Sequence, residues 1–128
     1  MATWKMKKLT PVLVVEHIEP CLGFWQKLGF EKTVEVPHEN ALGFVLLAKD
    51  GVEVMYQSLA SVRADVPGAA QTSKASFYLE VSALEPVLEA LAGAEVVLPR
   101  RKAFYGADEV FVREPGGNVI GFAAHPAE

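Results

Sequence analysis

The chain has 128 residues and a mass of 13.9 kDa, which suits one domain that buries about two thirds of its unfolded surface. Hydrophobic residues make up 51% and charged residues 22%, values that exclude a disordered or membrane-spanning chain. The net charge of −4 gives no general attraction to nucleic acid, and the single cysteine, Cys21, allows no intramolecular disulfide. We therefore expect a cytoplasmic protein with neither nucleic-acid nor membrane partners.

The first half of the chain predicts a strand, a helix and three further strands. Residues 9–15 are apolar and β-branched, which is typical of a strand. The helix that follows begins near Pro20, a residue suited to a first helical turn, and ends at Gly29, a natural C-terminal stop. Strands are then expected over residues 30–36, 42–48 and 52–58, with the turn pair Asp50 and Gly51 between the last two.

The second half repeats this order at a distance of 66 residues, a shift that places Val15 on Val81 and Gly51 on Gly117. It predicts strands over residues 76–81, 95–98, 109–113 and 118–123 and a helix over 86–91. The chain is therefore expected to form one α+β domain of two tandem βαβββ units, residues 6–58 and 75–125, with a linker over 59–74 and helices on one sheet face. The basic run 100–102, which follows Pro99, is interpreted as a solvated loop.

Several motifs together resemble one known superfamily. They are Pro11–Val15 leading into Leu22–Trp25, Lys27–Phe30, Val54–Gln57 and Arg113–Asn118. With these motifs the chain resembles the vicinal oxygen chelate superfamily, which comprises the glyoxalase, bleomycin-resistance and extradiol dioxygenase proteins. The resemblance covers nearly the whole chain and implies a curved mixed sheet around a pocket.

In the metal-using members, the resemblance implies one metal ligand each from the first and last strands of both units. The corresponding positions here are Thr10, Met55, Ser76 and Gly121. None of the four supplies an imidazole or a carboxylate, and hydroxyl and thioether groups are poor ligands for a divalent ion. We therefore expect no metal and no other cofactor.

Strand alternation extends these four positions into a predicted pocket lining, because residues two apart share one face of a strand. The inward-facing set comprises Thr10, Val12, Val14, Met55, Gln57, Ser76, Tyr78, Val119 and Gly121. The segment before the seventh strand adds Tyr105, Glu109 and Phe111 as residues at the pocket rim. Two alternatives remain at this point: side chains fill the cavity, and Glu109 and Arg113 serve in partly exposed cross-strand ion pairs.

The predicted lining combines apolar and aromatic surface with a few neutral polar groups, which suits a small organic molecule. We expect metal-free binding of an aromatic or heterocyclic molecule, which includes antibiotic sequestration of the kind that the bleomycin-resistance resemblance implies. The alternative is a glyoxalase- or dioxygenase-like enzyme, either with displaced ligands or with Glu109 and Tyr105 as a metal-independent acid–base pair. A homodimer is expected as well, because the half-open sheet of each unit needs a partner to close it.

Overall fold

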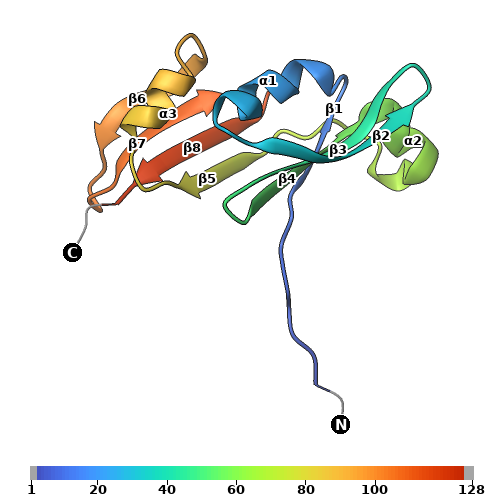
Figure 1. Ribbon diagram of the computed structural model, residues 1–128, viewed down its shortest axis with the longest axis horizontal. Coiled ribbons are helices and arrows are strands. Elements are labelled where there is room, and N and C mark those ends of the chain that lie inside the picture. Colours follow the sequence, from blue (N-terminus) through green and yellow to red (C-terminus); the bar gives the residue numbers. More distant parts are fainter. Residues whose placement is uncertain (1–2, 126–128) are drawn as a thin grey trace.

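A computed structural model describes residues 3–125 of the chain (Figure 1). The first unit consists of β1 (Val12–Val15), α1 (Glu19–Lys27), β2 (Glu31–His38), β3 (Ala41–Lys49) and β4 (Val52–Ser58). A short helix, α2 (Leu59–Asp65), and one 3₁₀ turn, Pro67–Ala69, follow. The second unit consists of β5 (Ser76–Glu80), α3 (Glu85–Ala90), β6 (Glu95–Lys102), β7 (Asp108–Arg113) and β8 (Val119–Ala124).

Each unit builds a four-stranded mixed sheet, with strand orders β1-β4-β3-β2 and β5-β8-β7-β6. The outer pairs β1–β4 and β5–β8 are parallel, and the remaining pairs are antiparallel. Val12 lies opposite Met55 and Tyr78 lies opposite Gly121, so the 66-residue shift carries one register onto the other. The predicted α+β fold of two βαβββ units is confirmed.

Two glycines that the repeat pairs with each other shape the turns before β4 and β8. Gly51 and Gly117 both have a positive φ, +80° and +95°, which L side chains rarely adopt. Each glycine lets an antiparallel hairpin turn tightly into the strand that occupies the middle of its sheet. The turn chemistry of the two units is therefore the same, although most of their side chains differ.

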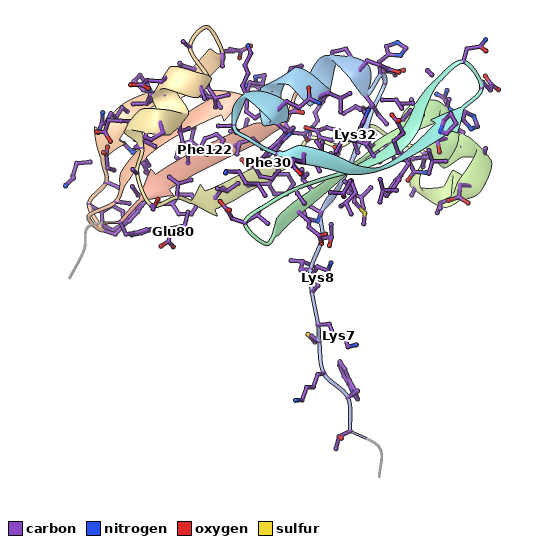
Figure 2. The ribbon with its side chains drawn as sticks, in the orientation of Figure 1. Lys7, Lys8, Phe30, Lys32, Glu80 and Phe122 are labelled. Atoms are coloured by element: carbon purple, nitrogen blue, oxygen red, sulfur yellow. The ribbon has the colours of Figure 1, made fainter. Side chains whose placement is uncertain are left out.

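The hydrophobic core lies between the two sheets and the helices α1 and α3, which cover the same side of the molecule (Figure 1). Leu13, Ile120 and Phe122 are at most 1% exposed, and each such side chain contributes about 1.5–3 kcal/mol on burial. Figure 2 shows Phe122 and Phe30 within this layer. The ring of Phe24 on α1 lies 6.5 Å from that of Phe122 on β8, so the core is continuous across both units.

Two segments differ from the sequence-based prediction. The predicted linker contains α2, which Ser58 caps by accepting a hydrogen bond from the Ser61 amide at 3.2 Å. Strand β6 continues to Lys102, so the interpretation of the basic run as a solvated loop is wrong. The strand passes Pro99 because its pairing with β7 is irregular between Leu98 and Arg101, which removes the need for a ladder hydrogen bond from the proline.

The side of the sheets opposite α1 and α3 is covered by neither of these helices, and we call it the open face (Figure 1). Helix α2 lies at its first-sheet end, where Gln57 Nε2 donates to Ser61 Oγ at 3.1 Å. Its residues follow from the strand registers and include Val12, Val14, Val34, Val36, Phe44, Leu46, Met55 and Gln57 in the first sheet and Ser76, Tyr78, Glu80, Glu95, Leu98, Arg101, Glu109, Phe111, Arg113, Val119, Gly121 and Ala123 in the second. Val12 is 44% exposed and Tyr78 is 48% exposed. No helix within residues 3–125 is long and apolar enough to span a bilayer.

Candidate functional site on the open face

The structure brings most of the predicted site residues onto the open face. In the first sheet, Val12 of β1 pairs with Met55 of β4, and Gln57 lies two residues further along β4. Thr10 precedes β1 and is partly buried, while Ser76 begins β5 and is exposed. In the second sheet the predicted residues form a compact group, which comprises Tyr78, Tyr105, Glu109, Phe111 and Gly121.

A buried carboxylate stands at the centre of this group. Glu109 is 0% exposed, although its register places it on the open face. Its Oε2 accepts hydrogen bonds from the hydroxyls of Tyr105 at 2.6 Å and Tyr78 at 2.8 Å. Its Oε1 accepts from Arg101 Nε at 3.0 Å, and Arg101 Nη2 lies 2.9 Å from the same oxygen. We call these four residues the Glu109 cluster.

The hydrogen bonds of the Glu109 cluster fix its charge state. The hydrogen bond from the Tyr105 hydroxyl, with those from the Tyr78 hydroxyl and the Arg101 guanidinium, lowers the pKa of Glu109 below its usual value against the opposing effect of burial. Burial, followed by the bonds to Tyr105 and Glu109, raises the pKa of Tyr78. The cluster therefore holds an ionised Glu109 carboxylate and a neutral Tyr78 hydroxyl at neutral pH.

The same bonds decide which groups remain available to a ligand. Both tyrosine hydroxyls use their hydrogen on Glu109, so each oxygen is left with acceptor capacity only. The Arg101 guanidinium keeps N–H donors beyond those directed at Glu109, and its side chain is 50% exposed. The cluster can thus offer donors from Arg101 beside acceptors from the tyrosines.

Aromatic rings surround these polar groups. The Phe111 ring lies over Gly121, where an added Cβ would come within 2.5 Å of Phe111 Cε2. The Tyr78 and Phe111 rings are 6.2 Å apart, and Phe104, wholly exposed, contacts Tyr105 edge-on at 4.9 Å. Gly121 therefore lets Phe111 lie flat against the sheet, which gives a planar molecule an aromatic surface to contact.

Arg101 is the member of the cluster that sequence reasoning missed. Glu109 and Arg113 both form cross-strand ion pairs, as the alternative had it: Arg101 pairs with Glu109, and Arg113 Nε donates to Glu95 at 2.8 Å. A signal was available: residues 101 and 109 flank a short connection, so a hairpin places them opposite each other. The proline before the basic run obscured it.

Comparison with known proteins identifies solved structures that share this fold. No family model matches the sequence, and no curated protein is significantly similar to it. Among solved structures, TioX from Micromonospora sp. ML1 superposes with a TM-score of 0.78 at 18% identity, covering 94% of this chain and 100% of TioX. The chain has the fold of the glyoxalase/bleomycin resistance protein/dioxygenase structures.

Two further structures support this assignment of the fold. A glyoxalase/bleomycin resistance protein/dioxygenase from Nocardioides gives a TM-score of 0.72 at 19% identity, covering 98% of this chain and 91% of that one. The bleomycin-binding protein of Streptomyces verticillus, in complex with copper(II)-bleomycin, gives 0.65 at 21% identity, covering 97% and 100%. These superpositions establish the glyoxalase/bleomycin resistance/dioxygenase fold of the chain. The chemistry of its ligand has to be inferred from the residues of the site.

The residues at the metal-ligand positions of this fold do not fit a divalent ion. Thr10 and Ser76 offer hydroxyls, Met55 a thioether and Gly121 no side chain, and the Phe111 ring covers Gly121. Within residues 3–125, no group of three or more His, Cys, Asp or Glu side chains is arranged to hold a metal ion. The donor chemistry therefore gives metal-dependent catalysis no support at these positions.

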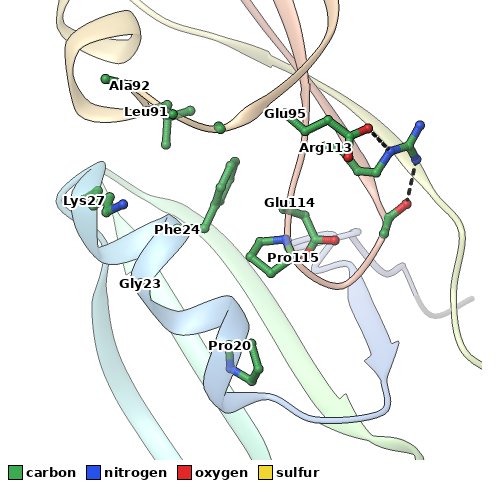
Figure 3. A pocket seen from close by; sticks show the side chains of 13 residues that line it. Pro20, Gly23, Phe24, Lys27, Leu91, Ala92, Glu95, Arg113, Glu114 and Pro115 are labelled. Atoms are coloured by element: carbon green, nitrogen blue, oxygen red, sulfur yellow. Dashed lines mark hydrogen bonds and ion pairs between the residues drawn. The ribbon is translucent and has the colours of Figure 1, made fainter.

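A separate cavity of about 660 Å³ lies on the helix side of the fold (Figure 3). Phe24 and Lys27 of α1 line one side of it, and Leu91 lies opposite, in the turn before β6. On its remaining side, the guanidinium of Arg113 is paired with the carboxylate of Glu95. No residue pattern predicted this cavity, because residues of both units line it.

Behind this cavity, a buried hydrogen-bond network joins the two units. Trp25 Nε1 donates to the Tyr56 hydroxyl at 2.8 Å, and this hydroxyl donates to Glu114 Oε2. The Asn118 amide and side chain donate to Glu114 Oε1 at 2.6 and 3.1 Å. Burial, and then the charge of Glu114, raises the pKa of the Cys21 thiol to about 12, so the thiol stays protonated and suits packing rather than catalysis.

Proposed function

We propose that the chain binds a small aromatic or heterocyclic organic molecule, without a metal, at the Glu109 cluster on the open face. The observation that carries this proposal is the pairing of fixed polar groups with exposed aromatic surface. Tyr78 and Tyr105 are each 48% exposed while their hydroxyls are held by Glu109. Polar groups oriented in advance, next to apolar surface, are what small-molecule sites in proteins generally offer.

The relatives in structure are consistent with such a role. The Streptomyces verticillus protein that shares this fold is a bleomycin-binding protein, and a second bleomycin-binding protein superposes with a TM-score of 0.65 at 14% identity. Antibiotic sequestration is therefore one form that the proposed binding takes. The ligand of this chain is defined here only by its chemistry.

We favour binding over acid–base catalysis because of the state of Glu109. Its two carboxylate oxygens accept hydrogen bonds from Tyr105, Tyr78 and Arg101, and these bonds lower its pKa. A carboxylate stabilised in this way is a weak base, and catalytic carboxylates are tuned in the opposite direction. The Glu109–Tyr105 pair is thus better suited to holding a ligand than to moving its protons.

A homodimer forms part of the proposal, because the open face alone is a surface rather than an enclosed pocket. Val12, Val36 and Tyr78 are 44%, 49% and 48% exposed on it. Covering these side chains with a second copy would remove apolar area from water and enclose the Glu109 cluster. Light scattering at micromolar concentration should give about twice the 13.9 kDa chain mass, and a value near 14 kDa would contradict the dimer.

A thermal-shift screen of aromatic antibiotics and heterocyclic metabolites, metal-free bleomycin among them, tests the binding proposal directly. Any compound that raises the melting temperature is then titrated by calorimetry against Tyr78→Ala, Arg101→Ala and the control Arg113→Ala. Tyr78→Ala should weaken binding by about 1–3 kcal/mol, and Arg101→Ala should also weaken it, because both residues belong to the site.

The control is matched because Arg113 forms the same kind of Arg–Glu pair, with Glu95, on the same strand face four residues from Glu109, where it also borders the helix-side cavity. Melting of each free variant, measured in parallel, separates loss of binding from loss of folding. Equal affinity of the wild type and the two cluster variants would show that the ligand binds elsewhere. A selective effect of Arg113→Ala would move the site to the helix-side cavity.

A further inference from the structure

One face of helix α1 borders the helix-side cavity over about two turns. Pro20, Gly23, Phe24 and Lys27 line the cavity, and their spacing of three and four residues places them along a single face of the helix (Figure 3). Figure 3 shows the Phe24 ring projecting from this face into the cavity. Gly23 and Lys27 are exposed, so a molecule that enters the cavity can reach both of them.

Gly23 is the unusual residue of this face. It lies in the middle of α1, where its φ is not positive, and glycine is the poorest helix former after proline. No neighbour requires its small size, because an added Cβ would meet nothing within 4 Å beyond the adjacent residues and the helix backbone. Gly43 and Gly121 differ, since an added Cβ there would lie 2.6 and 2.5 Å from a neighbouring side chain. The space beside Gly23 is thus open to a molecule that contacts the helix backbone.

The charged groups of the cavity differ in whether they already have a partner. The carboxylate of Glu95 accepts a hydrogen bond from Arg113, and that of Glu114 accepts from the buried network behind the cavity. Lys27, in contrast, forms no ion pair within residues 3–125. Arg113 also keeps N–H donors beyond those directed at Glu95 and the Gly117 carbonyl. The groups left for a ligand are therefore cationic donors, which favour an anion.

The size and the lining of the cavity favour a small molecule over a macromolecule. Its volume of about 660 Å³ lies within the range of about 300–1,000 Å³ that small-molecule sites occupy. A concave space of this size is filled by one compact molecule, whereas a stable protein partner needs about 800 Å² of contact on each side. Phe24, Leu91 and Pro115 supply apolar lining beside the cationic groups. This combination suits a molecule with an apolar body and one anionic group.

From these observations we propose that the helix-side cavity is a second binding site, which takes a planar aromatic carboxylate. The ring of the ligand lies against the backbone at Gly23 and against the Phe24 ring, where a flat molecule loses least contact. Its carboxylate accepts hydrogen bonds from the Lys27 ammonium, and the Arg113 guanidinium adds positive charge on another side of the cavity. This site is separate from the Glu109 cluster and goes beyond the binding proposed there.

Three probes that share a naphthalene ring and differ in charge test the site: naphthalene carboxylate, the corresponding alcohol and the corresponding amine. Each probe is titrated against isotope-labelled protein, and the amide shifts are followed by two-dimensional NMR. The carboxylate should bind with a dissociation constant of about 1 mM or lower, as expected for a molecule of this size, and should shift the amides of Gly23, Lys27 and Gly93. The alcohol and the amine should bind at least about 5-fold more weakly there.

Two variants with matched controls assign the bound probe to the cavity. Gly23→Leu fills the space beside α1 and should weaken binding of the carboxylate at least about 10-fold without lowering the melting temperature, because leucine is the better helix former. Its control is Gly68→Leu, where an added Cβ also meets nothing within 4 Å but lies outside the cavity lining. Lys27→Gln should weaken binding of the carboxylate about 5-fold and leave that of the alcohol unchanged. Lys74→Gln, which alters another exposed lysine, should change neither.

The amide shifts also separate this site from the Glu109 cluster. Shifts confined to the residues around Tyr78 and Phe111 would overturn the second site and leave the proposed function standing. Shifts around Gly23 that Gly23→Leu abolishes support the second site, whether or not the cluster binds a ligand. Equal binding of the carboxylate by wild type and Gly23→Leu, or tighter binding of the amine than of the carboxylate, overturns the proposal. A lower oligomeric mass of Gly23→Leu in light scattering assigns the cavity to a second copy of the chain and likewise overturns it.

Discussion

Replacing Tyr56 with Phe removes a single hydroxyl from the buried network that joins the two units. Tyr56 is 0% exposed, and its hydroxyl accepts a hydrogen bond from Trp25 Nε1 at 2.8 Å and donates one to Glu114. The aromatic ring is retained, so packing changes little. The variant therefore measures the free energy of unfolding that is lost when Trp25 Nε1 and Glu114 lose their shared hydrogen-bond partner.

The loss follows from the number of groups left without a partner. The Trp25 N–H and one carboxylate oxygen of Glu114 each lose a hydrogen bond, at about 1–3 kcal/mol per buried group, so Tyr56→Phe should cost about 2–6 kcal/mol. Glu114 keeps its two bonds from Asn118, which favours the lower half of that range. With an unfolding entropy of about 2.1 cal/mol/K per residue, a loss of 3 kcal/mol lowers Tm by about 11 °C.

Tyr105→Phe is the matched control, since it removes another tyrosine hydroxyl that donates to a carboxylate. Tyr105 is 48% exposed, so water can replace the lost donor to Glu109, and the cost should stay below about 1 kcal/mol. Both variants are melted by differential scanning calorimetry at pH 7. Equal shifts in Tm for the two variants would refute the argument that burial of the network determines its contribution to stability.

Three further outcomes are expected. A chelator should leave Tm unchanged and elemental analysis should find less than about 0.1 divalent ion per chain, because the donor set does not fit a metal; one ion per chain would restore the enzyme hypothesis. Tyr105 and its neighbours lower the folded-state pKa of Glu109, so the ionised carboxylate stabilises the fold above the unfolded pKa of about 4.3. This stabilisation is lost as the pH falls below that value. Glu109→Gln should therefore flatten the acid limb of a plot of Tm against pH. Gly121→Ala should cost about 1–3 kcal/mol in chemical denaturation, because its Cβ would meet the Phe111 ring at 2.5 Å, and a second change, Phe111→Leu, should recover part of that loss.

The sequence predicts the architecture because the fold depends on patterns that are local and repeated. Alternation along a strand separates Leu13 and Val15, which pack under the helices, from Val12, which lies on the open face. The 66-residue shift then transfers this division to the second unit, where Ile120 is buried and Tyr78 is exposed. Neither step requires knowledge of contacts between distant residues.

Side-chain contacts between distant segments could not be predicted in the same way. Arg101 joins the site because β6 is irregular after Leu98, and an irregular register cannot be read from residue alternation. The bond from Tyr56 to Glu114 spans 58 residues and depends on how the units pack. The predicted set of ligand-binding residues therefore remains a prediction about a face of the sheet, to which the structure adds the partners of Glu109.

The two sheets have the same strand order but carry different side chains at corresponding positions of the open face. In the first sheet, one cross-strand row of the open face consists of Val14, Gln57, Phe44 and Val36, and the row at the corresponding position of the second sheet consists of Glu80, Ala123, Glu109 and Arg101. The first row is largely apolar, whereas the second holds the buried carboxylate of Glu109, paired with the half-exposed Arg101, and the exposed carboxylate of Glu80. Removing a carboxylate from water is costly, and its ion pair gives little stability over apolar residues in the same place. Because the fold is maintained in the first unit without such a pair, stability gives no reason for the pair in the second unit, and the proposed recognition of a ligand would supply one.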